Sequence, residues 1–358
     1  MRSELLSNVS RIVVKLGTGI LTDEAKRPDW GQLTQLVGQI AGLRAMGHEV
    51  VMVTSGAVGA GMGVLGFSKR PTVLAELQAC AAVGQSRLMA TYERLFEVHK
   101  LNVAQVLLTH DDLEHHERHL NARNTLVALL QRGVVPIINE NDAVSFTELR
   151  FGDNDKLSAL VACLLPADLL VILTTSEGLM ENFGTPQARL LHHVDAIDDR
   201  IISMAGGTTS ATAVGGMATK IQAARIAVRS GIPLVIAPGR RSTVLARIMA
   251  GEDEGTLFVP RLAKLKGRKR WIAFFHHPKG TLVVDDGARK ALRERGTSLL
   301  APGIARHEGT FSEGDVIRIV DGDGTEFARG RARVGADKLA EAPGNSKVVV
   351  HRDDLVML

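Results

Sequence analysis

Short apolar runs recur between residues 11 and 240, and longer amphipathic segments separate them. The runs include "RIVVKLG", "EVVMVTSG", "NVAQVLLTH", "VVPIINEND", "DLLVILTTSEG" and "IPLVIAPG". Runs of this length predict β-strands, and the segments between them predict helices. Strands that alternate with helices pair in parallel and are covered on both faces. The sequence therefore predicts an α/β domain: a three-layer sandwich with a mostly parallel central sheet.

Small or polar residues follow the C-terminal end of each run. Because the carboxyl ends of parallel strands meet at one edge of a sheet, these residues predict one composite ligand site. They are Lys15 to Gly17, Thr54 to Gly56, Thr109 with His110, Asn139 to Asp142, Thr174 with Thr175, and Pro238 with Gly239.

The pattern changes after a basic segment that contains Arg261, Lys264, Lys266, Arg268, Lys269 and Arg270. Beyond it, β-like runs with Asp-Gly turns, such as "DVIRIVDGDGTEFARGRARV", predict a small β-rich module. We therefore expect a first domain over residues 1–258, a basic linker over 259–270 and a β-rich barrel over 271–358.

Composition restricts the class of protein. A length of 358 residues fits two domains, and a net charge of only +4 permits anionic ligands without requiring nucleic acid. Cys80 and Cys163 stand in apolar surroundings without metal-binding spacing, which favours buried free thiols. The N-terminus lacks the apolar core of a signal peptide, and no uninterrupted apolar span occurs. We expect a cytoplasmic protein without a membrane segment.

A glycine-rich stretch, "VMVTSGAVGAGMGVLG", follows the second predicted strand. Its Gly61-x-Gly63-x-x-Gly66 match lacks the position after the first strand and the acidic partner about 20 residues on that dinucleotide binding requires. We interpret this match as accidental, and no Walker-type phosphate loop is present. Gly56 and Gly59 fit either an anion site at a helix N-terminus or a turn without a ligand.

Two lysines stand at unusual positions. Lys15 extends a strand that looks buried, and Lys220 begins a helix, where its charge opposes the helix dipole. Both positions are explained if a polyphosphate lies between the two side chains, although a single lysine of this kind more often snorkels to the surface.

Carboxylates and amides gather in "INENDAVSFTELRFGDNDKLSALVA". Some could simply cap a helix, as Asp155 would. The set is nevertheless larger than one cap needs, and it suits an amino acid, with carboxylates for its ammonium group and amides for its carboxylate. Asp155 could also orient lysines or magnesium. The cluster consists of Asn139, Asn141, Asp142, Asp153, Asn154 and Asp155.

Motifs along nearly the whole chain resemble those of the glutamate 5-kinases, a branch of the amino acid kinase family. The most specific are "VVPIINENDAV", "FGDNDKLSALVA", "RHLNARNTL" and "GGMATKIQAA". The tail, in "GTLVVDDGA", "GTFSEGDVIRI" and "VHRDDL", resembles the PUA domain that many bacterial members carry. The resemblance implies ATP-dependent phosphorylation of the side-chain carboxylate of L-glutamate, the first step of proline biosynthesis.

The resemblance also implies roles for individual residues. Lys15 and Lys220 would stabilise the transferring phosphoryl group, and Asp155 would organise them. Ser55, Asp142 and Asn154 match glutamate-binding positions, to which the polar cluster adds Asn139 and Asp153. Mg²⁺ would arrive with ATP, and no protein ligand is assigned to it. Proline would act as a feedback inhibitor. The chain would form a homo-oligomer, either a dimer or a tetramer. The nucleotide-binding set is Lys15, Gly17, Thr174, Thr175, Val214, Gly215, Gly216, Met217, Ala218, Thr219 and Lys220.

Three positions depart from the family pattern. Thr175 stands where the family usually has aspartate, Val214 where it has threonine, and Ala218 where it has serine. "GLMENFG" also lacks the usual Asp-Pro pair. We expect weaker or altered ATP binding without loss of activity.

Two other functions compete with this interpretation. The first is a kinase for another acid, N-acetylglutamate or aspartate; Asp142 and Asp153 favour a free ammonium over an acetylated amine. The second is RNA binding through the PUA-like tail, which lacks a clustered aromatic surface. A zinc site at His115 and His119 is disfavoured, because a solvated helix face explains their spacing more simply.

Overall fold

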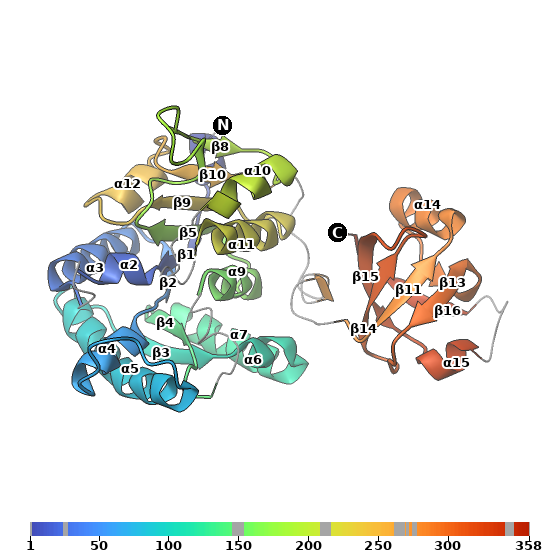
Figure 1. Cartoon of the computed structure of the whole chain (residues 1–358), viewed down its shortest axis with the longest axis horizontal. Helices are drawn as coiled ribbons and strands as arrows, with labels where there is room; N and C mark the ends of the chain where they lie inside the picture. Colours follow the sequence, from blue (N-terminus) through green and yellow to red (C-terminus); the bar gives the residue numbers. More distant parts are fainter. Residues whose placement is uncertain are drawn as a thin grey trace. The chain divides into compact units, whose positions relative to one another are not determined.

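The chain folds into two compact units, residues 1–264 and residues 265–358 (Figure 1). The structure is a computed structural model that describes residues 2–23, 28–144, 154–207, 216–260, 269, 272–273, 278–340 and 347–357. The first unit is an α/β sandwich and the second is built on a mixed β-sheet, so the predicted fold class is confirmed. The basic linker predicted over 259–270 lies largely outside the described residues.

An eight-stranded sheet forms the middle layer of the first unit, in the order β3-β4-β2-β1-β5-β9-β10-β8. Neighbouring strands in this sheet pair in parallel, except for β9 and β10, which pair antiparallel. The carboxyl ends of the parallel strands therefore share one edge. The strands are β1 Arg11–Leu16, β2 Glu49–Val53, β3 Val103–Leu108, β4 Val135–Glu140, β5 Leu169–Thr174, β8 His193–Val194, β9 Leu234–Pro238 and β10 Thr256–Phe258; β6 Met180–Glu181 and β7 Arg189–Leu190 form a separate hairpin.

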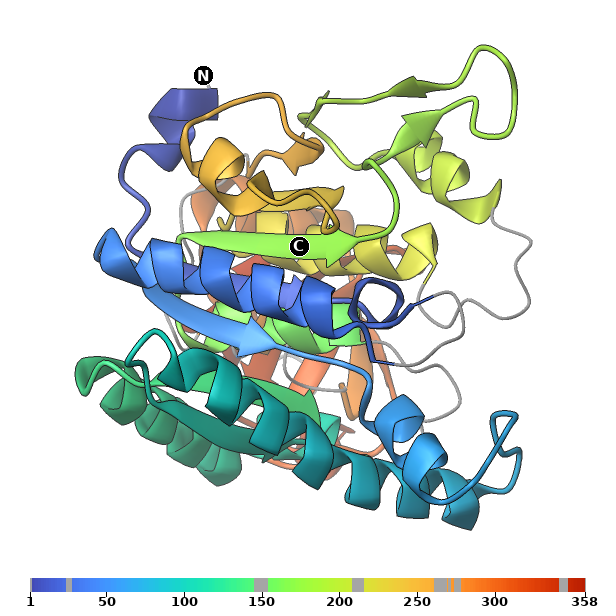
Figure 2. The same cartoon turned by 90° about the vertical axis from the view of Figure 1, so that its left-hand side faces the viewer.

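Helices cover both faces of this sheet (Figures 1 and 2). Helices α3, α5 and α12 share one apolar core with the strands, while α9 and α11 pack together on the opposite face. The helices are α1 Arg2–Leu6, α2 Thr18–Leu21, α3 Trp30–Ala45, α4 Ala57–Val64, α5 Leu74–Glu97, α6 His110–Glu114, α7 His116–Gln131, α9 Asn154–Leu164, α10 Asp199–Met204, α11 Met217–Arg229 and α12 Val244–Met249, with a 3₁₀ turn at Ala205–Gly207.

Strand β1 divides its side chains between the two faces. Ile12, Val14 and Leu16 enter the core shared with α3 and α5. Because side chains alternate along a strand, Val13 and Lys15 face the layer that contains α9 and α11. This alternation places the ammonium group of Lys15 under those two helices.

Two glycines, Gly61 on α4 and Gly84 on α5, allow these helices to pack closely. A Cβ on Gly61 would lie 1.8 Å from the carbonyl oxygen of Cys80, and a Cβ on Gly84 would lie 1.8 Å from that of Ala57. Gly61 lies inside α4, away from the turn that leaves β2. The Gly61-x-Gly63-x-x-Gly66 match thus has a packing explanation.

The second unit contains a six-stranded mixed sheet in the order β12-β16-β15-β14-β11-β13. Asp321 shapes the predicted Asp-Gly turn between β14 and β15, because its carboxylate accepts the backbone N–H groups of Asp323 and Thr325. The elements are β11 Gly280–Val284, α14 Asp286–Arg295, β12 Leu299–Leu300, a 3₁₀ turn at Ala301–Gly303, β13 Ile304–Glu308, β14 Val316–Val320, β15 Glu326–Ala332, α15 Ala336–Ala340 and β16 Val348–Met357.

No helix within the described ranges is long and apolar enough to cross a membrane.

Candidate active site

A buried carboxylate joins two lysines from distant parts of the chain. Lys15 Nζ lies 2.6 Å from Asp155 Oδ1, and Lys220 Nζ lies 3.0 Å from Asp155 Oδ2. Thr219 Oγ1 also donates to Asp155 Oδ2, at 3.0 Å. Asp155 is fully buried, and the two lysines are 4% and 5% exposed. The structure therefore brings together the two lysines that the sequence analysis placed on one ligand.

The elements that hold these residues explain their convergence. Lys15 stands near the carboxyl end of β1, Asp155 is the second residue of α9, and Lys220 lies in the first turn of α11. Helices α9 and α11 pack against each other, and α9 also packs on β1. The three groups thus meet where the sheet edge and two helix N-termini coincide.

The electrostatics of this triad favour an anion. Burial alone would raise the pKa of Asp155, but the charges of Lys15 and Lys220 and their hydrogen bonds outweigh burial and hold this pKa well below its usual range. Asp155 is therefore ionised at neutral pH. Two ammonium groups and one carboxylate give the triad a net charge of +1, and the N-terminus of α11 adds positive potential.

Amide and hydroxyl groups form a second cluster beside the triad. Asn154 Nδ2 donates to Asn139 Oδ1 at 2.7 Å and to Ser55 Oγ at 3.4 Å. Asn139 Nδ2 in turn donates to Gln85 Oε1 at 2.8 Å. All four residues are buried. Ser55, Asn139 and Asn154 were predicted as site residues. Gln85, on α5, was not, and the sequence marks it only as a polar residue among small and apolar ones.

The two clusters are contiguous because Asn154 and Asp155 are adjacent in the first turn of α9. Asn154 contacts the ends of β2 and β4, whereas Asp155 contacts β1 and α11. A ligand held by the amide cluster would therefore lie next to an anion held by the lysines.

The acidic residues predicted for this region are only partly described. Asp142 is half-buried in the turn after β4, whereas Asp153 lies outside the described residues. Glu140, the last residue of β4, is buried, and its Oε2 lies 4.0 Å from His110 Nδ1. Glu140 belongs to the predicted polar residues at this strand end, but the sequence predicts no role for it.

Part of the predicted nucleotide-binding set lies along the same sheet edge. Gly17 follows β1, and its N–H donates to the Leu173 carbonyl at 3.2 Å. Thr174 ends β5, and its carbonyl accepts the N–H of Gly239 at 2.8 Å. Thr175 follows and is exposed. The loops after β1, β5 and β9 are thus joined through their backbones.

The start of α11 provides the other part of this set. Gly216 caps the helix, and Met217 and Ala218 open its first turn. Val214 and Gly215 lie outside the described residues. The backbone N–H groups of this first turn are available to a ligand only in the direction of the helix N-terminus.

One histidine of the disfavoured zinc motif differs from expectation. His119 is buried, and its Nδ1 lies 3.1 Å from the Leu113 carbonyl, so a solvated helix face does not explain it. His115 is exposed at the start of α7. Within the described parts of the chain, no group of three or more His, Cys, Asp or Glu side chains is placed to hold a metal ion.

Comparison with known proteins identifies two families in the chain. The amino acid kinase family matches residues 10–238, and the PUA domain matches residues 280–353. Two solved structures share the fold: a carbamate kinase from Giardia lamblia and a UMP kinase from Bacillus anthracis, both with a TM-score of 0.50. They are 19% and 16% identical in sequence, each covers 71% of this chain, and 99% and 97% of their own chains are matched.

Full-length relatives are much more similar in sequence. Glutamate 5-kinases from Geobacter sp. (strain M21) and Pelobacter propionicus are 47% and 44% identical, over 100% of both chains. The glutamate 5-kinase of Marinomonas sp. (strain MWYL1) is 47% identical over 99% of both chains. The chain therefore belongs to the amino acid kinase family and, within it, to the glutamate 5-kinases that carry a C-terminal PUA domain.

Proposed function

We propose that this chain transfers the γ-phosphoryl group of ATP to the side-chain carboxylate of L-glutamate, which gives L-glutamyl 5-phosphate, the first step of proline biosynthesis. Full-length relatives that are named glutamate 5-kinase support this activity. The structural observation that carries it is the convergence of Lys15 and Lys220 on Asp155, directly beside the Asn154 cluster.

The chemistry requires charge stabilisation more than proton transfer. A glutamate side chain has a pKa of about 4.3, so its carboxylate is already ionised and needs no general base. An oxygen of this carboxylate attacks the γ-phosphorus, the bond to the β–γ bridging oxygen breaks, and ADP leaves. Lys15 and Lys220 offset the repulsion between the anions and stabilise the charge that spreads over the phosphoryl oxygens.

Asp155 acts in this scheme by holding both ammonium groups. Long lysine side chains have many rotamers, and a fixed carboxylate between them removes that freedom before the substrates bind. Thr219 fixes the same carboxylate from the α11 side.

The amide cluster is proposed to bind the amino acid. Ser55, Asn139 and Asn154 offer neutral donors for the α-carboxylate, and Asp142 with Asp153 would receive the ammonium group. An acetylated amine carries no charge and would leave these carboxylates without compensation, so N-acetylglutamate should be a poor substrate. Aspartate, shorter by one methylene, would place its carboxylate farther from the lysines.

The nucleotide is proposed to lie along the loops after β1, β5 and β9 and at the start of α11. Gly17, Thr174, Thr175 and the segment from Val214 to Lys220 would contact it, and Mg²⁺ would enter as the MgATP complex. The missing hydroxyls at Val214 and Ala218 and the missing carboxylate at Thr175 predict weaker ATP binding.

Four further properties stay predictions. Proline shares the α-carboxylate and amino group of glutamate, so we expect it to compete for the amide cluster. A homo-oligomer and a cytoplasmic location are expected by family resemblance. RNA binding through the PUA domain is the alternative to an interdomain or regulatory role for this domain; salt-dependent binding of the whole chain to structured RNA would support it, and no binding at low salt would exclude it.

One assay tests the proposed activity. The purified chain is incubated with ATP, Mg²⁺ and glutamate, N-acetylglutamate or aspartate, and hydroxylamine traps any acyl phosphate as a hydroxamate. We expect product with glutamate and little with the other acids. A preference for another acid would refute the substrate, and the absence of any hydroxamate would refute the activity.

A further inference from the structure

Three glutamines on one face of α3 hold the turn that follows β9. Gln32 Nε2 donates to the Gly239 carbonyl at 2.7 Å, and Gln39 Nε2 donates to the Arg241 carbonyl at 3.1 Å. Gln35 Nε2 lies 3.5 Å from the Arg240 carbonyl. Residues three and four apart on a helix share a face, so the three amides meet three successive carbonyls. The turn Gly239–Arg241 is thus fixed in place by α3.

Arg240 extends from this turn to the loop after β1. Its Nη2 donates to the Thr22 carbonyl at 2.7 Å and to the Gly19 carbonyl at 3.3 Å. Its Nη1 donates to Asp29 Oδ2 at 3.2 Å. The other oxygen of Asp29 caps α3 by accepting the Gln32 N–H at 3.0 Å. One guanidinium therefore contacts α2, the residue that follows it and the N-cap residue of α3.

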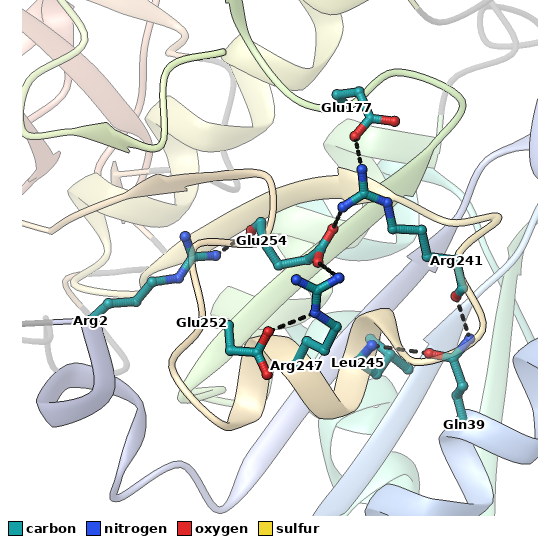
Figure 3. Close-up of polar contacts among 8 residues, drawn as sticks. All are labelled: Arg2, Gln39, Glu177, Arg241, Leu245, Arg247, Glu252 and Glu254. Atoms are coloured by element: carbon teal, nitrogen blue, oxygen red, sulfur yellow. Dashed lines mark hydrogen bonds and ion pairs between the residues drawn. The ribbon is translucent and has the colours of Figure 1, made fainter.

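Arg241 extends in a different direction, to the loop after β5 (Figure 3). It donates to Glu177, three residues beyond Thr174, and to the buried carboxylate of Glu254. Glu254 is 1% exposed, and its Oε2 also lies 3.0 Å from Arg247 Nη1 in an ion pair, while its backbone carbonyl accepts a hydrogen bond from Arg2. Glu254 thus provides a rigid anchor for Arg241.

Gly239 brings this turn directly against α2 and β5. A Cβ at this position would lie 2.6 Å from Ile20 Cδ1, on α2, and 3.0 Å from Leu173 Cβ, on β5. The turn therefore fills the space between α2, which follows β1, and the end of β5, with no room for a larger residue at Gly239.

We propose that the turn Gly239–Arg241 positions the nucleotide side of the active site, with Arg240 holding the loop after β1 and Arg241 holding the loop after β5. This inference rests on the proposed function, because those loops carry Gly17, Thr174 and Thr175 of the nucleotide-binding set. Arg240 and Arg241 act through these loops and are positioning residues. They should affect ATP binding and leave glutamate binding unchanged.

Two glutamates provide a matched pair of variants. Glu177 and Glu252 are both about half exposed, and each accepts one arginine of the Glu254 anchor. Only Glu177 belongs to the loop after β5. We expect Glu177→Gln to raise the KM for ATP two- to fourfold, as an exposed ion pair allows, with the KM for glutamate unchanged. Glu252→Gln should change neither constant.

Arg240→Lys tests the other loop. Lysine keeps the charge but lacks the planar guanidinium group that donates to Thr22, Gly19 and Asp29 at the same time. We expect the KM for ATP to rise about fivefold, with the KM for glutamate within twofold of the unsubstituted value.

Binding of a fluorescent ATP analogue, measured without any acid, separates this inference from the proposed function. If the unsubstituted chain binds the analogue but forms no hydroxamate, the activity fails, and weaker binding by Arg240→Lys still supports the positioning role. Equal affinity of Arg240→Lys and the unsubstituted chain would overturn the inference. So would equal effects of Glu177→Gln and Glu252→Gln, or a matching rise in the KM for glutamate.

Discussion

Asp155→Asn tests the arrangement of the two lysines. Asparagine has the same shape but no charge, and it presents an oxygen to one ammonium group and an amide N–H to the other. Because Lys15 and Lys220 both lie within 3.0 Å of the carboxylate, one of them must lose its partner atom. The lysine that faces the amide group is then repelled from its position.

The magnitude follows from burial. Asp155 is fully buried and both lysines are at most 5% exposed, so solvent compensates little. Removing one partner of a buried ion pair costs about 3–5 kcal/mol of folding free energy. The loss of a preorganised charge at the transferring phosphoryl group lowers kcat about 100- to 1000-fold. The KM for glutamate should change little, because the proposed glutamate site is the Asn154 cluster.

Urea unfolding and the hydroxamate assay measure these two effects. Asp354→Asn provides the control, because Asp354 is also buried and lies 3.7 Å from Arg333, but in the second unit. The control should lose stability and keep kcat. A folded Asp155→Asn variant with kcat within threefold of the unsubstituted enzyme would refute the role of Asp155.

The same substitution changes the pH dependence of stability. The folded-state pKa of Asp155 lies below the unfolded value of about 3.9, so its stabilisation is complete above about pH 5 and is lost as the pH falls. Near pH 4, where about half of the unfolded chains carry a proton on this group, it contributes a slope of about 0.6 kcal/mol per pH unit, which grows toward about 1.4 kcal/mol per pH unit as the pH falls further. Unfolding at pH 5, 4 and 3.5 should show a steeper decline for the unsubstituted chain than for Asp155→Asn; parallel curves would contradict the lowered pKa.

Four other substitutions test separate parts of the account. Thr175→Asp restores a family carboxylate and should lower the KM for ATP; no improvement would remove Thr175 as the cause of weak binding. Asn154→Ala should raise the KM for glutamate about tenfold, because it removes donors to Asn139 and Ser55, with the KM for ATP unchanged. Gly84→Ala should cost at least about 2 kcal/mol in urea unfolding, since its Cβ would meet the α4 backbone. Gly63→Ala, with open space around its Cβ, should be neutral or slightly stabilising.

The sheet and the main site residues could be predicted because their signals are local. Buried parallel strands read as apolar runs, and the polar residues after each run mark the ligand edge. Lys15 and Lys220 were found because a charge in a buried strand and a cation at a helix start are both unfavourable without a partner. Asp155 was predicted because more carboxylates and amides surround it in the sequence than one helix cap needs.

The residues that were missed act through contacts distant in sequence. Gln85 meets Asn139 across 54 positions, and Gln32 meets Gly239 across 207. The position of a glutamine on a helix does not indicate which remote group its side-chain amide will contact. The packing role of Gly61 was missed for the same reason, because it depends on where α5 lies. His119 was misjudged because helical spacing alone does not distinguish a buried face from a solvated one.

A crystal structure with glutamate and the Mg²⁺ complex of a non-hydrolysable ATP analogue tests the central claim most directly. The account predicts the γ-phosphate within hydrogen-bonding distance of both Lys15 Nζ and Lys220 Nζ, and the glutamate side chain directed at it from the Asn154 cluster. A γ-phosphate that contacts neither lysine, or glutamate bound away from Asn154, would contradict it.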